Sequence, residues 1–502
     1  MLELTVFLCG ALVMVLEMVG ARVLAPHVGT SAIVWTSLIG VVLAFLALGA
    51  WAGGKFADKK LSKRGLAAAL LGGACGCALT AFFNNSIGSG ITGLVGNLHA
   101  AAVLAAICIF ALPAFFFGMI TPYVIRLRIA SVDTAGATVG RLYALSTTGS
   151  ILGTFLGGFI LISWFSSASI LWGVALAMLL LSLANAAARP VPRIALLFLV
   201  AFLAWQDHSY SGWLAAREGK MLIETPNNSI RVMKGVDKRH GKVLLIATDP
   251  GYTQSGMLVD DPNELYFNYT RYYALGLKYA PHAKSVLMLG GGGYSVPKWL
   301  LSDKSGLARP FSVDVVELDP AMTALAKGGF GLPNDPALNI RHEDARAFLN
   351  AQKKQYDLVF VDVFNSHYSI PFHMGTVEAA RVLRRAVAPG GALMMNIISA
   401  VEGPDGRLFQ SIWQALKQEF GEIRVYCVGD PETPEAVQNI MVLAFPEAPD
   451  YSRQYRGISN SPDADEVERM ERNLYTRPIV PLVPPLRDEF APVERYALML
   501  TR

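Results

Sequence analysis

The segment MLGGGGYSVPKWL (288–300) places four consecutive glycines directly after an apolar run: Gly290, Gly291, Gly292 and Gly293. Glycines at the end of a strand let the backbone turn tightly and approach a bound ligand closely, although the same turn can be purely structural. Glu317 lies 24 residues beyond the last glycine, close to the spacing at which an acid binds ribose hydroxyls in dinucleotide folds. The loop and this acid together favour nucleoside binding.

Two further acids, Asp344 and Asp362, end later apolar segments of the same region. The loop lacks the Lys-Ser/Thr pair of a phosphate-binding P-loop, and GGGGYS differs from the dinucleotide pattern G-x-G-x-x-G. A ligand with a ribose but without a phosphate is therefore favoured. S-adenosylmethionine and its relatives fit this description.

These residues need a scaffold that brings the ends of strands together. Short apolar runs alternate with helical segments, and the predicted strands are 285–290, 311–319, 338–344, 357–364 and 388–398. This alternation predicts a parallel, doubly wound sheet in a Rossmann-like α/β domain, which binds ligands at the carboxyl ends of its strands. Two β-type runs upstream, 227–235 and 242–248, predict a small antiparallel sheet. Residues 264–280 are predicted to form a helix.

The first 205 residues are rich in apolar residues, whereas most of the charged residues follow them. A helix needs about 20 mostly apolar residues to cross a bilayer. Six segments qualify: 4–24, 31–53, 65–83, 100–121, 142–163 and 168–187. A seventh apolar run, 194–205, has only 12 residues. The sequence predicts a transmembrane α-helical domain with six or seven spans in a lipid bilayer.

Lys and Arg collect in alternate loops, above all in KFADKKLSKRG (55–65), whereas the intervening loop 84–99 carries neither. Basic loops of this kind stay in the cytoplasm. With six spans the charged C-terminal half faces the cytoplasm, and with seven it lies outside. Because a nucleoside ligand is cytosolic, we expect an inner (cytoplasmic) membrane protein whose C-terminal half faces the cytoplasm.

Gly149, Gly153 and Gly157 recur every four residues in the fifth predicted span. This pattern is typical of close helix packing or of a homodimer formed through the membrane domain. Glu17 and Arg22 lie within or at the end of the first span. Such residues form structural ion pairs between helices or mark a transport path.

Charge and cysteine spacing argue against two other kinds of ligand. The net charge of +4 is small and spread along the chain, so no nucleic-acid partner is expected. Cys75 and Cys77 are two residues apart and have no partner pair, so no metal is expected.

The residues of this region resemble the spermidine synthase (polyamine aminopropyltransferase) family, in particular its membrane-fused bacterial members. The resemblance covers residues 221–446, and the apolar N-terminus matches the fused type. The motifs that carry it are LGGGGYSVPKW, VVELDP, HEDARAFL, YDLVFVDVFNSHYSIPFH and the C-terminal DEFAPVER. The resemblance implies a methyltransferase-type Rossmann fold that binds a sulfonium nucleoside and an amine or polyamine.

By this resemblance Glu317 binds the ribose hydroxyls and Asp344 contacts the adenine. Asp362 matches the first acid of the family's catalytic loop, where a carboxylate takes the proton of the attacking amine or holds that amine in line. The alternative role for Asp362 is that of a helix N-cap or loop acid. Residues that align with the family's substrate-lining hairpin and the helix after it are Asp249, Gln254 and Tyr269.

The chain departs from the family pattern at two positions. Gly293 stands where the family loop has an acid that meets the aminopropyl ammonium of decarboxylated S-adenosylmethionine. Asn365 replaces the second acid of the catalytic loop, which helps to hold the polyamine. Loss of two carboxylates weakens the negative field that a diamine acceptor needs.

Three functions remain open on the sequence. The first is aminopropyl transfer from decarboxylated S-adenosylmethionine to an amine, with release of methylthioadenosine. The second is methyl transfer from intact S-adenosylmethionine, or its cleavage, on the same fold. The third is a transporter or sensor gated by a nucleoside or polyamine. The expected domains are the transmembrane domain 1–205, a linker and small sheet 206–280, the catalytic domain 281–446 and a C-terminal extension 447–502.

Overall fold

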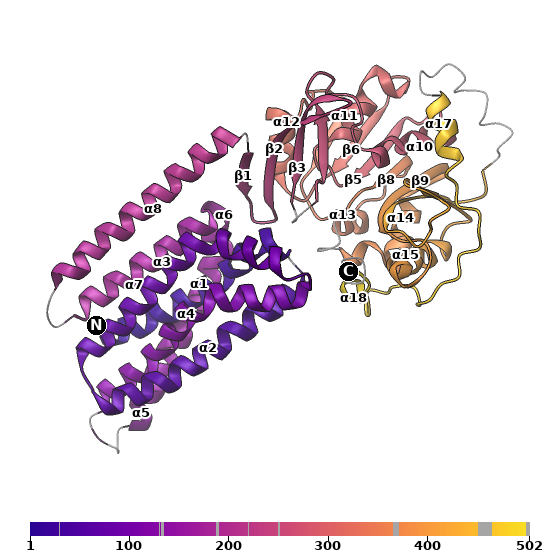
Figure 1. The fold of residues 1–502 in the computed structure, drawn as a ribbon. Helices are drawn as coiled ribbons and strands as arrows, with labels where there is room; N and C mark the ends of the chain where they lie inside the picture. The colour runs from indigo at the N-terminus through magenta and orange to yellow at the C-terminus, as the bar shows by residue number, and fades with distance from the viewer. Residues whose placement is uncertain are drawn as a thin grey trace. The chain divides into compact units, whose positions relative to one another are not determined.

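The structure is a computed structural model that describes residues 1–29, 31–129, 131, 135–186, 190–218, 220–248, 252–364, 371–449 and 464–497. The chain divides into two compact units, Met1–Ser229 and Ile230–Arg502. The first unit is built mainly from long helices and the second from strands and shorter helices (Figure 1).

Long apolar helices build the first unit: α1 (Leu2–Val28), α2 (Ala32–Lys59), α3 (Lys63–Leu94), α4 (Leu98–Arg128), α5 (Ala135–Phe155), the π-helical η1 (Leu156–Leu161), α6 (Ile162–Trp164), α7 (Ser167–Ala184) and α8 (Pro190–Glu218). Among the described residues, six helical segments are long and apolar enough to cross a membrane, with α5, η1 and α6 forming one of them. Trp51, Phe159 and Trp164 expose most of their surface, as expected for side chains that face lipid.

Glycines allow α1 and α5 to pack in direct backbone contact. A Cβ at Gly149 would lie 2.0 Å from the carbonyl oxygen of Phe7. A Cβ at Gly153 would lie 2.2 Å from the carbonyl oxygen of Ala11. The small residues of this stripe therefore serve helix packing within one chain, and these contacts need no second copy.

Arg22 forms a structural ion pair, but its partner is distant in sequence. Its guanidinium donates to the carbonyl oxygen of Ile162 at 2.7 Å and to Glu224 at 3.1 Å. Glu224 ends β1 (Lys220–Glu224) and also accepts the backbone N–H of Ser167. The charge of Arg22 is thus balanced within the first unit by Glu224. Glu17 lies on the same helix, α1, and is not the partner of Arg22 in this ion pair.

The second unit begins with a small antiparallel sheet. Its strands β2 (Ser229–Asp237), β3 (Gly241–Ala247) and β4 (Ser255–Leu258) pair in sequence order. The first two confirm the predicted β-type runs. β4 was not predicted, because four residues are too few to show an alternating pattern.

A seven-stranded sheet follows, in the order β10-β11-β9-β8-β5-β6-β7. Its strands are β5 (Ser285–Leu289), β6 (Ser312–Val316), β7 (Leu338–Arg341), β8 (Tyr356–Val361), β9 (Val387–Ser399), β10 (Glu422–Cys427) and β11 (Gln438–Phe445). β5 to β9 pair in parallel, which confirms the predicted doubly wound sheet. β10 and β11 are antiparallel additions that the sequence analysis did not predict. Their connection, 428–437, is too short for a parallel crossover.

The helices of this unit are α9 (Asn268–Arg271), α10 (Tyr273–Tyr279), α11 (Ser295–Leu301), α12 (Pro320–Gly329), α13 (Ala345–Ala351), α14 (Val377–Ala386), α15 (Arg407–Lys417), α17 (Ala464–Glu471) and α18 (Val493–Ala497), with short 3₁₀ turns η2 (Asp303–Ser305), η3 (Phe372–Met374) and η4 (Pro404–Gly406). The single helix predicted for 264–280 is wrong in its extent. It starts only at Asn268, because the carbonyl of Leu265 accepts the side chain of Arg271 instead of a helical N–H, and it divides into α9 and α10.

The strand order creates one crevice at the carboxyl edge of the sheet. The chain passes from β5 to β6 on one side and later to β8 on the other side of β5. Ligands of open α/β sheets bind at such a switch point. The residues that follow β5 and β8, the glycine loop and Asp362, therefore lie side by side.

Candidate active site

The glycine loop leaves β5 and packs directly against the end of β8. Gly290 has a φ of +90°, and a Cβ there would lie 2.3 Å from the carbonyl oxygen of Asp362. No other residue fits this position without moving the backbone. The first glycine of the loop is therefore required for its contact with Asp362.

The N–H groups of the next three glycines bind side chains of the protein. Gly291 and Gly292 donate to Oε2 of Glu317 at 2.8 and 3.1 Å. Gly293 donates to Oγ of Ser255, on β4, at 2.9 Å. The loop is thus fastened to β6 on one side and to the small sheet on the other.

Glu317 is buried directly after β6, with 8% of its surface exposed. Its Oε1 accepts the N–H of Asp319 at 2.9 Å, in addition to the two bonds from the loop. Burial raises the pKa of Glu317, and the three backbone hydrogen bonds oppose that shift. A carboxylate has about four acceptor positions, so about one remains for a ligand hydroxyl.

Asp344 is the N-cap of α13. Its Oδ1 accepts the N–H groups of Arg346 and Ala347, both at 2.9 Å. Its Oδ2 lies 3.1 Å from Nε2 of His373. Asp344 therefore has a structural role at the start of this helix, and a ligand would have to share Oδ2 with His373.

Asp362 is half-buried and follows β8 directly. Its Oδ1 accepts the amide of Asn396 at 3.1 Å, and its Oδ2 accepts the hydroxyl of Tyr269 at 3.3 Å. Burial raises the pKa of Asp362, and these two hydrogen bonds oppose the shift. Burial and the adjacent carboxylate raise the pKa of Tyr269, so the phenol stays neutral and can donate.

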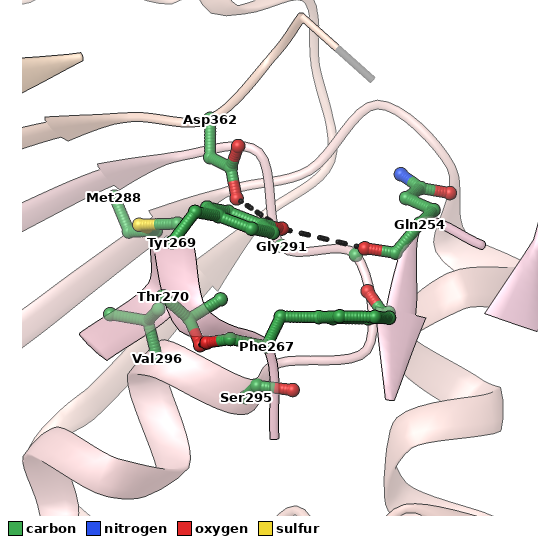
Figure 2. A pocket seen from close by; sticks show the side chains of 11 residues that line it. Gln254, Phe267, Tyr269, Thr270, Met288, Gly291, Ser295, Val296 and Asp362 are labelled. Atoms are coloured by element: carbon green, nitrogen blue, oxygen red, sulfur yellow. Dashed lines mark hydrogen bonds between the residues drawn. The ribbon is translucent and has the colours of Figure 1, made fainter. Parts of the chain in front are cut away.

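Tyr269 and Asp362 point toward each other across a pocket at the switch point (Figure 2). The ring of Phe267 stacks on that of Tyr269, with centroids 6.1 Å apart, and forms an aromatic wall. Asp362 is the only carboxylate among the described residues of the lining. The other lining residues are Gln254, Ser255, Thr270, Met288, Gly291, Gly292, Ser295 and Val296.

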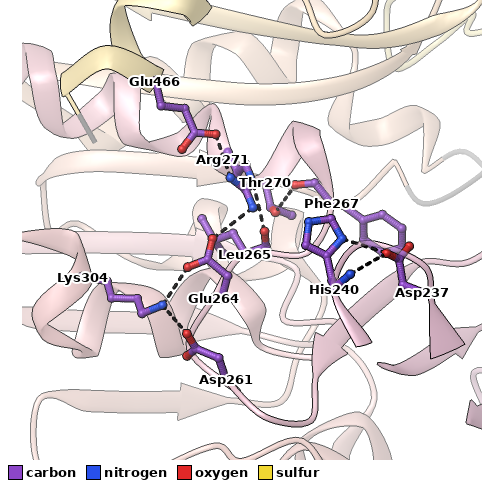
Figure 3. A network of polar contacts seen from close by, with 10 residues as sticks. All are labelled: Asp237, His240, Asp261, Glu264, Leu265, Phe267, Thr270, Arg271, Lys304 and Glu466. Atoms are coloured by element: carbon purple, nitrogen blue, oxygen red, sulfur yellow. Dashed lines mark hydrogen bonds and ion pairs between the residues drawn. The ribbon is translucent and has the colours of Figure 1, made fainter. Parts of the chain in front are cut away.

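A network of ion pairs fixes α9, the helix that carries Tyr269 (Figure 3). Arg271 pairs with Glu264 at 3.0 Å and with Glu466 of α17 at 2.9 Å. Lys304 of η2 pairs with Glu264 at 2.7 Å. Because these pairs join α9 to two other elements, the position of the phenol does not depend on α9 alone.

The structure thus brings Gln254, Tyr269 and Asp362 together with the glycine loop around one pocket. Glu317 lies behind the loop, bound to its N–H groups, and Asp344 is not among the residues that line the pocket. Asp249 and Asn365 lie outside the described residues. The structure describes no group of three His, Cys, Asp or Glu residues that could hold a metal ion.

Two residues that bind the glycine loop and Asp362 were not predicted. Ser255 binds the loop from β4, and Asn396 binds Asp362 from β9. Asn396 is the single polar residue in the apolar run ALMMNII. Because a buried polar side chain needs a hydrogen-bond partner, its position could have indicated a contact with another polar residue. Ser255 carries no comparable signal, because its role depends on a contact between two sheets.

Tyr294 ends the loop in a backbone conformation that is rare for a residue with a side chain. Its φ is +57°, and its ring is fully buried. Its hydroxyl lies 2.6 Å from Oγ1 of Thr323, which lies 2.9 Å from Nε2 of His342. Packing and these bonds hold the left-handed turn in place.

No family model matches the chain, but individual relatives do. The polyamine aminopropyltransferase of Vibrio vulnificus is 26% identical over 215 residues, which cover 41% of this chain and 68% of the relative. That of Chromobacterium violaceum is 27% identical over 220 residues, which cover 43% and 76%. A probable spermidine synthase structure from Corynebacterium glutamicum has a TM-score of 0.40 and 24% identity, and covers 53% of this chain and 90% of its own. The two sequence matches confirm the resemblance that the motifs indicate.

Proposed function

We propose that this chain, whose α/β unit resembles polyamine aminopropyltransferases, is a membrane-integrated enzyme of that type. It would transfer an aminopropyl group from decarboxylated S-adenosylmethionine to an amine and release methylthioadenosine. The observation that carries the proposal is the pairing of Asp362 with Tyr269 beside the glycine loop at the switch point. The amine or polyamine acceptor would occupy the same pocket.

The proposed reaction is a displacement at carbon. The nitrogen of an uncharged amine attacks the carbon next to the sulfonium, the new C–N bond forms and the C–S bond breaks. The sulfur leaves as neutral methylthioadenosine, and the nitrogen gives up a proton. Oδ2 of Asp362 takes that proton or holds the amine in line, because it is the carboxylate oxygen that lies beside the hydroxyl of Tyr269 in the pocket lining.

Glu317 and Asp344 are proposed to bind the nucleoside. Glu317 has about one free acceptor position, so one ribose hydroxyl can bind without disturbing the loop. A second ribose bond would require one loop N–H to leave the carboxylate. Asp344 would receive the adenine amino group on Oδ2, next to His373.

The proposed location is the inner membrane, with the N-terminus, the basic loops and the catalytic domain in the cytoplasm. This assignment rests on the six apolar helices and on the distribution of Lys and Arg. The proposed boundaries are a transmembrane domain 1–205, a linker and small sheet 206–280, a catalytic domain 281–446 and a C-terminal extension 447–502. A homodimer through the membrane domain stays a prediction without support from the glycine stripe, because Gly149 and Gly153 pack against α1 of the same chain.

One observation favours a second function, the use of intact S-adenosylmethionine for methyl transfer or cleavage. A Cβ at Gly293 would lie 2.8 Å from Cβ of Ser255. The loop therefore has no room for an acid at this position while β4 stays in place. A site without that acid repels the carboxylate of intact S-adenosylmethionine less strongly.

Purified full-length protein in detergent, supplied separately with each sulfonium and a panel of amines, tests both functions. Products are identified by mass spectrometry. Methylthioadenosine together with an aminopropylated amine supports aminopropyl transfer. S-adenosylhomocysteine, or methylthioadenosine formed without an acceptor, supports the second function instead.

Asp362→Asn should abolish turnover, and Asp260→Asn, at an exposed acid of the same unit, should not. If neither sulfonium is consumed with any amine, or if Asp362→Asn is as active as the unchanged protein, the proposed function is wrong.

A further inference from the structure

We propose that Asn396 is a positioning residue for Asp362: its amide holds Oδ1 of the carboxylate, so that Oδ2 faces the pocket. This inference rests on the proposed function, because it gives the carboxylate of the proposed reaction a fixed partner. It gives a role in the proposed reaction to a residue on β9, the strand next to β8, which Asp362 follows.

The contacts of Asn396 leave its amide one orientation. Asn396 is 2% exposed, and its Nδ2 donates to Oδ1 of Asp362 at 3.1 Å. Its Oδ1 accepts the amide of Asn439, on β11, at 3.0 Å. Because an ionised carboxylate can only accept, the nitrogen end must point at Asp362, and the oxygen end is left to accept from Asn439. The two asparagines form a chain that runs across β11, β9 and the end of β8.

Asn396 and Tyr269 make different kinds of contact with Asp362. The phenol has one proton, and its oxygen lies 3.3 Å from Oδ2 of Asp362 and 3.4 Å from the carbonyl oxygen of Gln254. Tyr269 can therefore turn to Gln254 and leave Oδ2 free for an amine. Asn396 has no alternative acceptor among the contacts described, so it keeps Oδ1 in place while Oδ2 exchanges partners.

The amide also favours the ionised form of the carboxylate. Two titratable groups face Asp362 from the neighbouring elements, Tyr269 on α9 and Tyr273 on α10. Both phenols have raised pKa values and stay neutral, so neither adds a negative charge beside Asp362, and a phenol carries no positive charge. Among the described residues, the hydrogen bonds from Asn396 and Tyr269 are what opposes the effect of burial on the pKa of Asp362. A hydrogen bond to a charged group changes a pKa by about one to two units.

Asn396→Leu and Asn396→Asp in the full-length protein test the proposal. The first keeps the size of the side chain and removes the donor. The second keeps the shape and replaces the donor with an acid that must share a proton with Asp362. The matched control is Asn339→Leu, because Asn339 on β7 also donates its amide to a carboxylate of the sheet, Asp314, at 2.9 Å but away from the pocket.

Two measurements are made on each variant. The first is the pH profile of kcat/KM for aminopropyl transfer. The second is an infrared pH titration of the carbonyl band of protonated Asp362, identified by its loss in Asp362→Asn. For both Asn396 variants we expect the acid limb and the infrared midpoint to move about one to two units toward higher pH. Asn339→Leu should leave both unchanged.

The outcomes separate this inference from the proposed function. If the protein consumes neither sulfonium but the infrared midpoint moves in both Asn396 variants, the positioning role stands and the proposed function falls. If the protein is active and neither the acid limb nor the midpoint moves, Asn396 is a structural residue only. An equal shift in Asn339→Leu would also overturn the inference, because it would show that losing an amide donor away from the pocket has the same effect.

Discussion

At the scale of single residues, the site depends on one carboxylate that is costly to ionise. Burial raises the pKa of Asp362, and hydrogen bonds from Asn396 and Tyr269 bring it back toward its usual range. A base works best when its pKa is near the working pH. The combination of partial burial with two neutral donors thus suits Asp362 for taking a proton from an amine.

The same burial predicts a gain in stability when the charge is removed. Asp362→Asn should raise the thermal unfolding midpoint at neutral pH, because the folded protein no longer buries a carboxylate. Since the folded pKa lies above the unfolded value of about 3.9, the contribution of Asp362 to stability is complete below that value. It is lost as the pH rises through the folded pKa.

The measurement is thermal unfolding of both proteins in detergent from about pH 4 to about pH 8. The advantage of Asp362→Asn should grow as the pH rises, whereas Asp260→Asn, at an exposed acid, should follow the unchanged protein. Parallel curves for Asp362→Asn and the unchanged protein would contradict the prediction.

At the scale of elements, the glycine loop is held by three contacts with different neighbours. Gly290 touches the backbone at Asp362, Gly291 binds Glu317 and Gly293 binds Ser255. The strand β5, its neighbours β6 and β8, and the small sheet therefore all set the position of one turn. A substitution that breaks any of these contacts should therefore shift the glycine loop and alter the shape of the pocket.

Gly290→Ala should abolish activity and lower the unfolding midpoint. The new Cβ would lie 2.3 Å from the carbonyl oxygen of Asp362, on a backbone with a φ of +90°. The control is Gly306→Ala, where φ is +67° but nothing lies within 4 Å. The control should show only the strain of the left-handed backbone, about 1–2 kcal/mol. Equal losses in the two variants would mean that the contact with Asp362 is unimportant.

Gly293→Asp should lower stability when made alone, because its Cβ would lie 2.8 Å from Cβ of Ser255. Adding Ser255→Gly removes that obstacle and leaves an acid in the loop. The double variant should be more stable than the single one, although it also lacks the Oγ that accepts the N–H of Gly293. It should raise kcat/KM for decarboxylated over intact S-adenosylmethionine by about tenfold, equivalent to about 1.4 kcal/mol. A double variant that is no more stable than the single one would show that Ser255 does not fill this space.

At the scale of the whole molecule, the two units are held together internally by different means. Both units bury apolar side chains, but among the described helices only those of the first unit approach one another through glycines while large apolar side chains stay exposed on the outside. A helix pair without a hydrophobic driving force gains stability from close packing. The contact between α1 and α5 is the clearest case, since backbone meets backbone there.

Gly149→Leu should disrupt this contact, because even a Cβ would lie 2.0 Å from the carbonyl oxygen of Phe7. Gly140→Leu is the matched control, on the same helix, with nothing within 4 Å of its Cβ. We expect Gly149→Leu to lower the unfolding midpoint and the yield in detergent, and Gly140→Leu to leave both near the unchanged values. If both variants behave alike, the helices are not packed through Gly149.

The sequence by itself determined the features that depend on neighbours along the chain. Runs of apolar residues predicted the six long helices, and the alternation of strands with helices predicted the parallel sheet. The same alternation placed the glycine loop and Asp362 at the ends of their strands. Each helix or strand is indicated by its own apolar residues and their spacing, which can be seen within one segment.

Only the tertiary structure decided which residues meet. It assigned Glu317 to the N–H groups of the loop, placed Asp344 at a helix N-cap and brought Asn396 and Ser255 to the site from β9 and β4. It also ran β11 antiparallel to its neighbours β9 and β10 in the sheet. Contacts between residues far apart in sequence depend on strand order and on packing between sheets. The spacing of apolar residues within a single segment determines neither of them.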